Sequence, residues 1–143
     1  GGASIVAGGK RIGPTLYRPT VLVNPARDAK VSQKEVFGPL ICVYGYDSID
    51  TAIEQANALP YAFQASVFTE RVHIADYCVD ALAASAVMVN DHTAFRVDWM
   101  PFAGRRQSGL GTGGIGYTMA DMSTKKMVVI NTPSGSFASK VSG

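Results

Sequence analysis

The feature that most constrains the fold is an alternation of strand-like and helix-like segments between residues 40 and 90. Residues 40–46, 64–68 and 86–90 are predicted to be strands, and 86–90 is continuously apolar, as in strands buried on both faces. The two segments between them carry apolar side chains at i, i+3, i+4 and i+7, which is the helical repeat. Strands and helices that alternate with short links form right-handed crossovers and a parallel sheet. We therefore expect an α/β fold of three layers, with helices on both faces of a parallel sheet.

Capping residues mark where these two helices begin. Asp47 or Ser48 can cap the first helix and Thr69 the second, because their side-chain oxygens accept bonds from the free N–H groups of a first turn. The apolar positions are Ile49, Ala52, Ile53 and Ala56 in the first helix, and Ile74, Tyr77, Cys78, Ala81 and Leu82 in the second. These two faces are expected to cover the sheet.

Shorter elements are predicted on either side of this alternation. Residues 4–7 and 19–23 have strand composition with Gly and Pro turns between them, and 117–122 is a short helix. Residues 126–131 form an apolar, β-branched strand with no later partner in the chain. Such a strand must pair with an element already formed or with another subunit. The Ser/Gly-rich residues 132–143 are expected to be a flexible tail.

Composition argues against several classes of function. With 143 residues, 47% of them hydrophobic and 17% charged, the chain is expected to form one globular domain with part of its surface covered by a partner. A net charge of +2 is too small to indicate nucleic-acid binding. No apolar run reaches the roughly 20 residues of a membrane span, and no signal peptide is visible. The chain begins with Gly1 and not with methionine, so we expect a processed or excised piece of a longer protein.

The two cysteines are predicted to be small core residues. Cys42 lies within a predicted strand, and Cys78 lies on the apolar face of a predicted helix. They form no CxxC pair and have no neighbouring histidine, which argues against a disulfide framework, a zinc site and an activated thiolate. We therefore expect no metal ligands, no catalytic cysteine and a reducing, cytoplasmic location.

Glu35 and Phe37 place a carboxylate and an aromatic ring directly before the first predicted strand of the alternation. Gly38 and Pro39 are expected to fix a bend at this point. A carboxylate can accept two hydrogen bonds from the vicinal hydroxyls of a ribose, and the ring can cover a flat heterocycle. The alternative interpretation is a surface glutamate beside a core phenylalanine, and the local sequence leaves both open.

A loop dense in polar and aromatic side chains follows the third strand of the alternation. It spans residues 91–99 and contains Arg96 and Trp99. Ligands of open α/β sheets bind at the carboxyl ends of parallel strands, which is where this loop begins. Arg96 among aromatic residues suits a planar or anionic group, and an ion pair with Asp91 or Asp98 is the equal alternative.

A glycine-rich segment after this loop formally matches GxGxxG at Gly109, Gly111 and Gly114. This motif would indicate an independent nucleotide-binding enzyme. However, no strand leads directly into it, no Asp or Glu follows Asp121, and too little chain remains for a βαβ unit. We therefore interpret these glycines as positions where the backbone turns tightly against a neighbouring element.

The order of several short motifs resembles the C-terminal part of the NAD(P)-dependent aldehyde dehydrogenase superfamily. No single motif is decisive, but the ordered set is specific and runs from about residue 1 to residue 131. The motifs are Glu35-Val36-Phe37-Gly38-Pro39, Asn57 with Tyr61, Val89-Asn90, Pro101-Phe102-Ala103-Gly104, Ser108-Gly109-Leu110-Gly111 and the closing apolar strand. Two departures are Ala103, where glycine is usual, and Ala62-Phe63-Gln64, where Gly-Leu is usual after Tyr61.

The resemblance implies roles for particular residues. Glu35 matches the glutamate that binds the nicotinamide ribose of NAD or NADP, and Phe37 matches the ring beside the nicotinamide. Phe102 matches an aromatic residue of the substrate tunnel. The loop with Arg96 and Trp99 matches the variable segment that selects the substrate, so these two are candidate substrate-binding residues. The loop sequence is similar to that of members acting on small anionic aldehydes, such as phosphonoacetaldehyde.

The same resemblance implies that the chain is only part of an enzyme. The cysteine nucleophile, its partner glutamate and the dinucleotide-binding domain would precede Gly1, so the chain alone is expected to be inactive. Residues 1–125 would be the C-terminal part of the catalytic domain. Residues 126–131 would be an oligomerisation strand that joins a homodimer or homotetramer. The alternative is a non-catalytic module that oligomerises or binds a ligand by itself.

Overall fold

The strands of the chain form three small sheets in the structure, a computed structural model that describes residues 2–131. One sheet has three strands, and the other two have two strands each. The first contains β1 (Ser4–Ala7), β2 (Thr20–Val23) and β3 (Leu40–Val43); the second β4 (Tyr61–Ala62) and β7 (Arg105–Arg106); and the third β5 (Gln64–Val67) and β6 (Ala86–Val89). The helices are α1 (Lys30–Gln33), α2 (Ile49–Asn57), α3 (Val72–Ala81) and α4 (Ile115–Asp121). The mixed α/β class is therefore as predicted.

The single parallel sheet expected from the alternation is divided between two of these sheets. β2 and β3 pair in parallel, and so do β5 and β6, but β3 and β5 are not paired. The three-layer arrangement on one sheet is therefore not what residues 2–131 form. β3 pairs with β2, and residues 24–39 between them include α1 and make the crossover that two parallel strands require.

The starts of the two longer helices differ from each other. Ser48 caps α2 as predicted, and its Oγ accepts the N–H of Thr51 at 3.2 Å. Thr69 does not cap α3, which begins three residues later and has no side-chain cap. The Oγ1 of Thr69 instead accepts the N–H of Arg71 at 3.1 Å, so this hydroxyl stabilises the turn before the helix.

The core is small and lies among α2, α3 and β6. Its buried apolar residues within the described part are Ile53, Cys78 and Met88, one from each of these elements. Cys78 is the most deeply buried of the three, at 1% exposed, which confirms it as a core residue. Cys42 is only half-buried, because β3 is an edge strand whose alternate side chains face outward.

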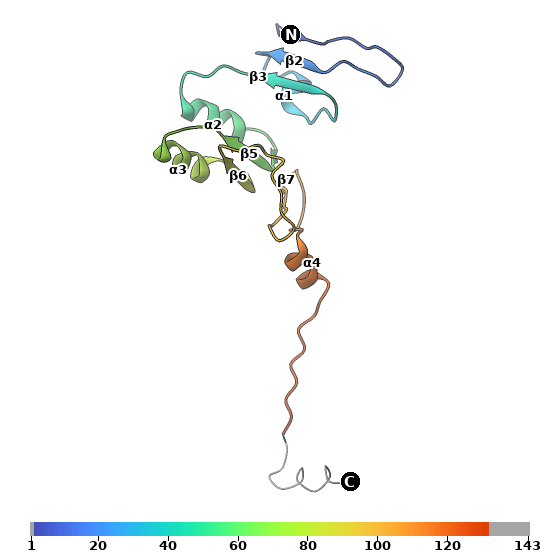
Figure 1. Ribbon diagram of the computed structural model, residues 1–143, viewed down its shortest axis with the longest axis vertical. Coiled ribbons are helices and arrows are strands. Elements are labelled where there is room, and N and C mark those ends of the chain that lie inside the picture. The colour runs from blue at the N-terminus through green and yellow to red at the C-terminus, as the bar shows by residue number, and fades with distance from the viewer. Residues whose placement is uncertain (1, 132–143) are drawn as a thin grey trace.

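The C-terminal part of the described chain runs away from the sheets. Figure 1 shows the sheet of β1, β2 and β3 at one end of the molecule, and α4 with the extended segment at the other. Residues 126–131 are predicted as a strand but pair with no element of residues 2–131, and Met127, Val128, Val129 and Ile130 are exposed. The predicted tail at 132–143 lies outside the described residues. No helix in residues 2–131 is long and apolar enough to cross a membrane.

Candidate functional site

Glu35 and Phe37 lie in the bend between α1 and β3, as expected. Phe37 has a φ of 37°, a conformation that a bulky residue rarely adopts, and its side chain is 96% exposed. The bend is tied to the first sheet, because the carbonyl of Pro39 accepts the N–H of Thr20 at 2.8 Å. The backbone therefore holds the Phe37 ring out from the fold. The alternative of a core phenylalanine is wrong.

A shallow hollow of about 410 Å³ lies beside this bend. Glu35, Phe37 and Cys42 are among the residues that line it. Within residues 2–131, the Glu35 carboxylate has no ion pair and accepts no hydrogen bond, so both of its oxygens remain available to a ligand. An unpaired carboxylate next to an exposed ring on one hollow fits the recognition of a ribose joined to a flat heterocycle.

The loop at residues 91–99 begins at a firmly held residue. Asn90 has a φ of 56°, and its N–H donates to the carbonyl of Val67 at 2.8 Å. Its side chain forms two bonds to the backbone of Thr69, accepting from the N–H at 2.8 Å and donating to the carbonyl at 2.9 Å. The hydroxyl of Ser66 donates to the carbonyl of Asp91 at 2.6 Å. The start of the loop is thus fixed to the end of β5.

Arg96 packs against an aromatic ring. Its guanidinium carbon lies 4.3 Å from the ring centroid of Phe102. The ion pairs with Asp91 or Asp98 that the sequence also allowed are absent, since the one salt bridge in residues 2–131 joins His92 to Asp91 at 3.9 Å. Contact with a ring face attracts the cation without using its N–H groups, so the donors of Arg96 stay available to an anion.

Phe102 has a second ring partner, which the sequence did not identify as part of the site. The rings of Phe63 and Phe102 meet at 88°, with centroids 5.0 Å apart. Phe102 also pairs with Gly113 through two backbone hydrogen bonds of 3.0 and 2.7 Å. The available signal for Phe63 was its place in the segment that departs from the usual Gly-Leu. Trp99 lies nearby in sequence and is 77% exposed.

The glycine-rich segment shapes the backbone next to Phe102. A side chain at Gly104 would come within 2.3 Å of the carbonyl oxygen of Ser108, so the turn between them closes only with glycine. Gly114 has a φ of 114°, and a Cβ there would lie 2.7 Å from the carbonyl of Met100. Of the three motif glycines, only Gly114 makes such a close approach, because a Cβ at Gly109 would meet nothing closer than 3.5 Å and one at Gly111 nothing within 4 Å.

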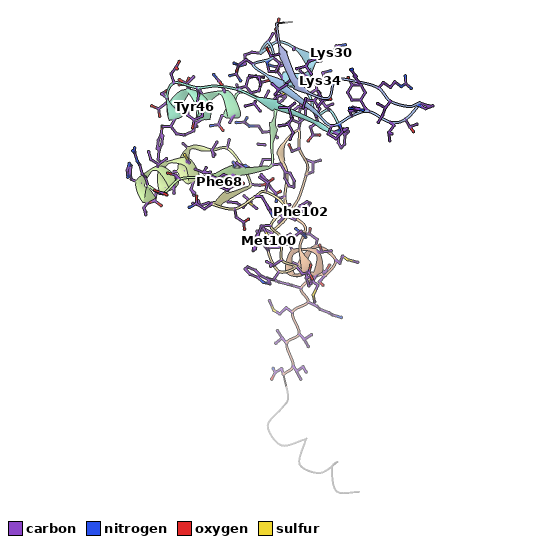
Figure 2. The ribbon with its side chains drawn as sticks, turned by 45° about the horizontal axis from the view of Figure 1, so that its top comes forward. Lys30, Lys34, Tyr46, Phe68, Met100 and Phe102 are labelled. Atoms are coloured by element: carbon purple, nitrogen blue, oxygen red, sulfur yellow. The ribbon has the colours of Figure 1, made fainter. Side chains whose placement is uncertain are left out.

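The five predicted site residues fall into two groups. Glu35 and Phe37 belong to the bend beside the first sheet, whereas Arg96, Trp99 and Phe102 belong to the segment that follows β6. Figure 2 shows Lys34, the neighbour of Glu35, at the first sheet, and Met100 and Phe102 together nearer α4. No group of three or more His, Cys, Asp or Glu side chains within residues 2–131 could hold a metal ion.

Comparison with known proteins identifies the family of the chain. The model of the aldehyde dehydrogenase family matches residues 1–128. The chain therefore belongs to the aldehyde dehydrogenase family.

Relatives of similar sequence are named as aldehyde dehydrogenases. The chain is 39% identical to 3-sulfolactaldehyde dehydrogenase from Priestia megaterium over 130 residues, which is 91% of this chain and 27% of the relative. It is 36% identical to lactaldehyde dehydrogenase from Methanococcus aeolicus over 131 residues, 92% of this chain and 28% of the relative. The chain thus spans about a quarter of the length of the relatives that it matches.

Solved structures of the same family have a similar fold. Aldehyde dehydrogenase 21 from Physcomitrella patens, in complex with the reaction product succinate, matches with a TM-score of 0.80 and 31% identity, over 85% of this chain and 25% of that one. Glyceraldehyde-3-phosphate dehydrogenase from Methanocaldococcus jannaschii, complexed with NADP, matches with a TM-score of 0.79 and 33% identity, over 86% and 26%.

Proposed function

We propose that this chain is the C-terminal part of an NAD(P)-dependent aldehyde dehydrogenase that oxidises a small anionic aldehyde to its acid. The main support for an anionic substrate is the environment of Arg96. Its guanidinium lies on the Phe102 ring and has no carboxylate partner within residues 2–131. A preceding segment of the protein would supply the cysteine nucleophile and the dinucleotide-binding domain. The chain itself would provide a ribose ligand and one wall of the substrate tunnel.

The chemistry of Arg96 fits an anionic substrate tail. A guanidinium presents several N–H donors in one plane, which match the oxygens of a sulfonate, phosphonate or carboxylate. Relatives with 39% and 33% identity are named for 3-sulfolactaldehyde and sulfoacetaldehyde, both of which carry a sulfonate. Trp99 and Phe102, exposed by 77% and 42%, would cover the apolar part of such a small substrate.

Glu35 and Phe37 would hold the nicotinamide end of the cofactor. The Glu35 carboxylate would accept the two ribose hydroxyls, and the Phe37 ring would cover one edge of the nicotinamide. Bound NAD(P) supplies the hydride acceptor of the reaction. Because the residues that read the adenosine ribose would lie in the preceding segment, the choice between NAD and NADP is made outside this chain.

The exposed apolar segment at residues 126–131 would complete the assembly. A β-branched segment with unpaired backbone groups is suited to join a sheet of a second subunit, which gives a dimer or a tetramer. Removal of residues 126–143 should therefore lower the molar mass of the full-length enzyme in light scattering. An unchanged mass would assign the subunit contact to another surface.

A hybrid enzyme tests the proposal directly. This chain would replace the matching C-terminal quarter of the Priestia megaterium enzyme, and kcat/KM would be measured for 3-sulfolactaldehyde and for neutral lactaldehyde. We expect activity with both, and we expect Arg96→Ala to reduce kcat/KM about 10–100-fold for the sulfonate alone, as befits a lost charged hydrogen bond. Arg18→Ala, which removes an exposed arginine two residues before β2, is the matched control. An equal loss for both substrates would remove Arg96 as the anion ligand.

The second candidate, a self-sufficient binding module, makes a different prediction for the isolated chain. The proposed function predicts no aldehyde oxidation with NAD or NADP, because a site without its nucleophile cannot turn over. Measurable activity that is abolished by Cys42→Ala or Cys78→Ala would contradict it. Tight binding of NAD or NADP to the isolated chain, measured by calorimetry, would favour the binding module.

A further inference from the structure

We propose that Phe63 is a positioning residue that orients the Phe102 ring beneath Arg96, and that it thereby sets the preference for anionic over neutral aldehydes. The proposal rests on the proposed function for its consequence in catalysis. Its structural part, the dependence of the Arg96 position on Phe63, stands on the contacts of this chain alone. Phe63 itself would contact neither the substrate nor the cofactor and would act only through Phe102.

The first step is the geometry of the three side chains. Phe63 and Phe102 meet edge to face at 88°, and Arg96 lies 4.3 Å from the Phe102 centroid. Two rings in this arrangement gain about 0.5–1.5 kcal/mol beyond their burial, and the gain depends on their relative orientation. The Phe63 ring therefore restricts rotation of the Phe102 ring. Because a cation is attracted to the face of a ring and not to its edge, this restriction fixes where Arg96 binds.

The second step is the firm anchorage of Phe63 itself. Its carbonyl accepts three hydrogen bonds, from the N–H of Ser85 at 2.7 Å, from the Ser85 hydroxyl at 2.6 Å and from the N–H of Ala86 at 3.3 Å. These bonds hold the residue between β4 and β5 against the start of β6. With the backbone held in this way, only the two side-chain torsions of Phe63 remain to be fixed when its ring packs against Phe102, which is itself 42% exposed.

The third step is the absence of any competing partner for Arg96. No carboxylate lies within 4.0 Å of its guanidinium, and the described residues give it no hydrogen bond. Its position therefore depends on the Phe102 face, and through it on Phe63. A loose guanidinium would lose side-chain freedom each time it bound an anion, whereas one already seated on a ring would lose less.

Nuclear magnetic resonance of this chain tests the structural part. The δ protons of Arg96 should be shifted upfield by the Phe102 ring current, and Phe102→Leu should abolish that shift. We expect Phe63→Leu to remove at least half of it, whereas Phe63→Tyr and the exposed control Phe68→Leu should preserve it.

The stack of Arg27 on Tyr44, at 3.9 Å, is an internal control that must persist in every variant. If the leucine variant does not fold, Phe63→Met provides the same test without a ring. Full retention of the Arg96 shift in a folded ringless variant would overturn the inference.

The hybrid enzyme described above tests the catalytic part. The ratio of kcat/KM for 3-sulfolactaldehyde to that for lactaldehyde should fall about 3–10-fold in Phe63→Leu, through KM for the sulfonate, with kcat unchanged. Phe63→Tyr keeps an aromatic ring at this position, so its ratio should equal that of the parent hybrid. If a variant has lost the upfield shift of the Arg96 δ protons but keeps the parent ratio of kcat/KM for the two aldehydes, the inference is overturned and the proposed function still stands. A parent hybrid inactive toward both aldehydes would instead overturn the proposed function, and the resonance experiment would still decide the role of Phe63.

Discussion

The two parallel strand pairs of the molecule, β2 with β3 and β5 with β6, end in the same way. In each pair an asparagine follows one strand in the left-handed region, with a φ of 48° at Asn24 and 56° at Asn90. Its N–H donates to the last carbonyl of the neighbouring strand, that of Val43 or Val67, at 2.8 Å in both cases. Asparagine is one of the few residues other than glycine that adopt this conformation readily, so the same device ends both strands.

The two pairs differ in how strongly the asparagine side chain is held. Asn24 accepts one bond, from the N–H of Gly45 at 3.1 Å, whereas Asn90 forms two bonds with Thr69, of 2.8 and 2.9 Å. The chain after Asn24 leads to α1 and the bend with the isolated Phe37 ring. The chain after Asn90 leads to the loop whose Arg96 packs on the ring of Phe102. One backbone device thus supports two loops, and the asparagine side chain is held by more hydrogen bonds at the start of the second loop.

The largest expected effect comes from opening the turn at residues 104–108, which contains β7, the partner of β4. In Gly104→Ala, a Cβ would lie 2.3 and 2.4 Å from the carbonyl oxygen and carbon of Ser108, so the backbone must move. We expect a loss of about 3 kcal/mol in the free energy of unfolding, measured by urea titration with the fluorescence of Trp99, the sole tryptophan.

Gly109→Ala is the matched control for this glycine. The nearest neighbour of a Cβ at Gly109 would be the Cα of Gly104 at 3.5 Å, which is an ordinary contact. We expect its free energy of unfolding to stay within about 1 kcal/mol of the parent. Similar losses in the two variants would mean that the close approach at Gly104 does not determine the turn.

The next effect compares the two asparagines directly. Asn90→Ala loses two side-chain bonds and places alanine in the left-handed region, which should cost about 2–3 kcal/mol of unfolding free energy. Asn24→Ala loses one bond and should cost about 1–2 kcal/mol. The glycine variants keep the backbone conformation, so they isolate the side-chain bonds. If Asn24→Gly were as destabilising as Asn90→Gly in urea titrations, the difference between the two strand ends would be refuted.

Local sequence patterns were sufficient for the longer helices and strands, but not for the short elements α1, β4 and β7 or for the pairing of the strands. The helical repeat with Ser48 before it predicted α2, and strand composition predicted β1 and β2, because these features depend on neighbours a few residues away. The pairing of β3 with β2 depends on α1, whose four residues carry no apolar repeat. Sheet order is a choice among distant strands with similar composition, and periodicity does not distinguish them.

The candidate site was predictable to the same extent. The bend at residues 35–39 followed from Gly38 and Pro39, and the loop after Asn90 followed from the end of periodicity. The contact of Arg96 with Phe102 instead of Asp91 or Asp98 requires the turn that folds the chain back at Met100. The ring of Phe63 lies 39 positions before Phe102 in the sequence, so no local spacing could join them.

A smaller effect should separate the cofactor and substrate groups by function. In the hybrid enzyme, Glu35→Gln replaces a carboxylate that would accept two ribose hydroxyls with an amide that offers one acceptor oxygen. We expect KM for the dinucleotide to rise about tenfold, with little change in KM for the aldehyde. Glu70→Gln, at an exposed carboxylate outside both groups, is the control. If KM for the aldehyde rose instead, Glu35 would belong with the substrate residues, and the separation of cofactor and substrate residues into two groups would be wrong.

The smallest effect concerns a link between α2, which follows β3, and α3, which connects β5 to β6. The hydroxyl of Tyr77 in α3 donates to Asp50 in α2 at 2.6 Å, and this hydrogen bond, with the nearby negative charge, raises the pKa of Tyr77 above its ordinary value of 10.0. The folded chain therefore keeps this proton more tightly than the unfolded chain, so the contribution to stability is complete below pH 10 and is lost as the pH rises through the folded-state pKa. Because the pair is at the surface, the effect should be slight. Urea titrations between pH 8 and about 11 should show a steeper loss of stability in the parent than in Tyr77→Phe. Parallel curves for the two proteins would show that the hydrogen bond does not join the helices in solution.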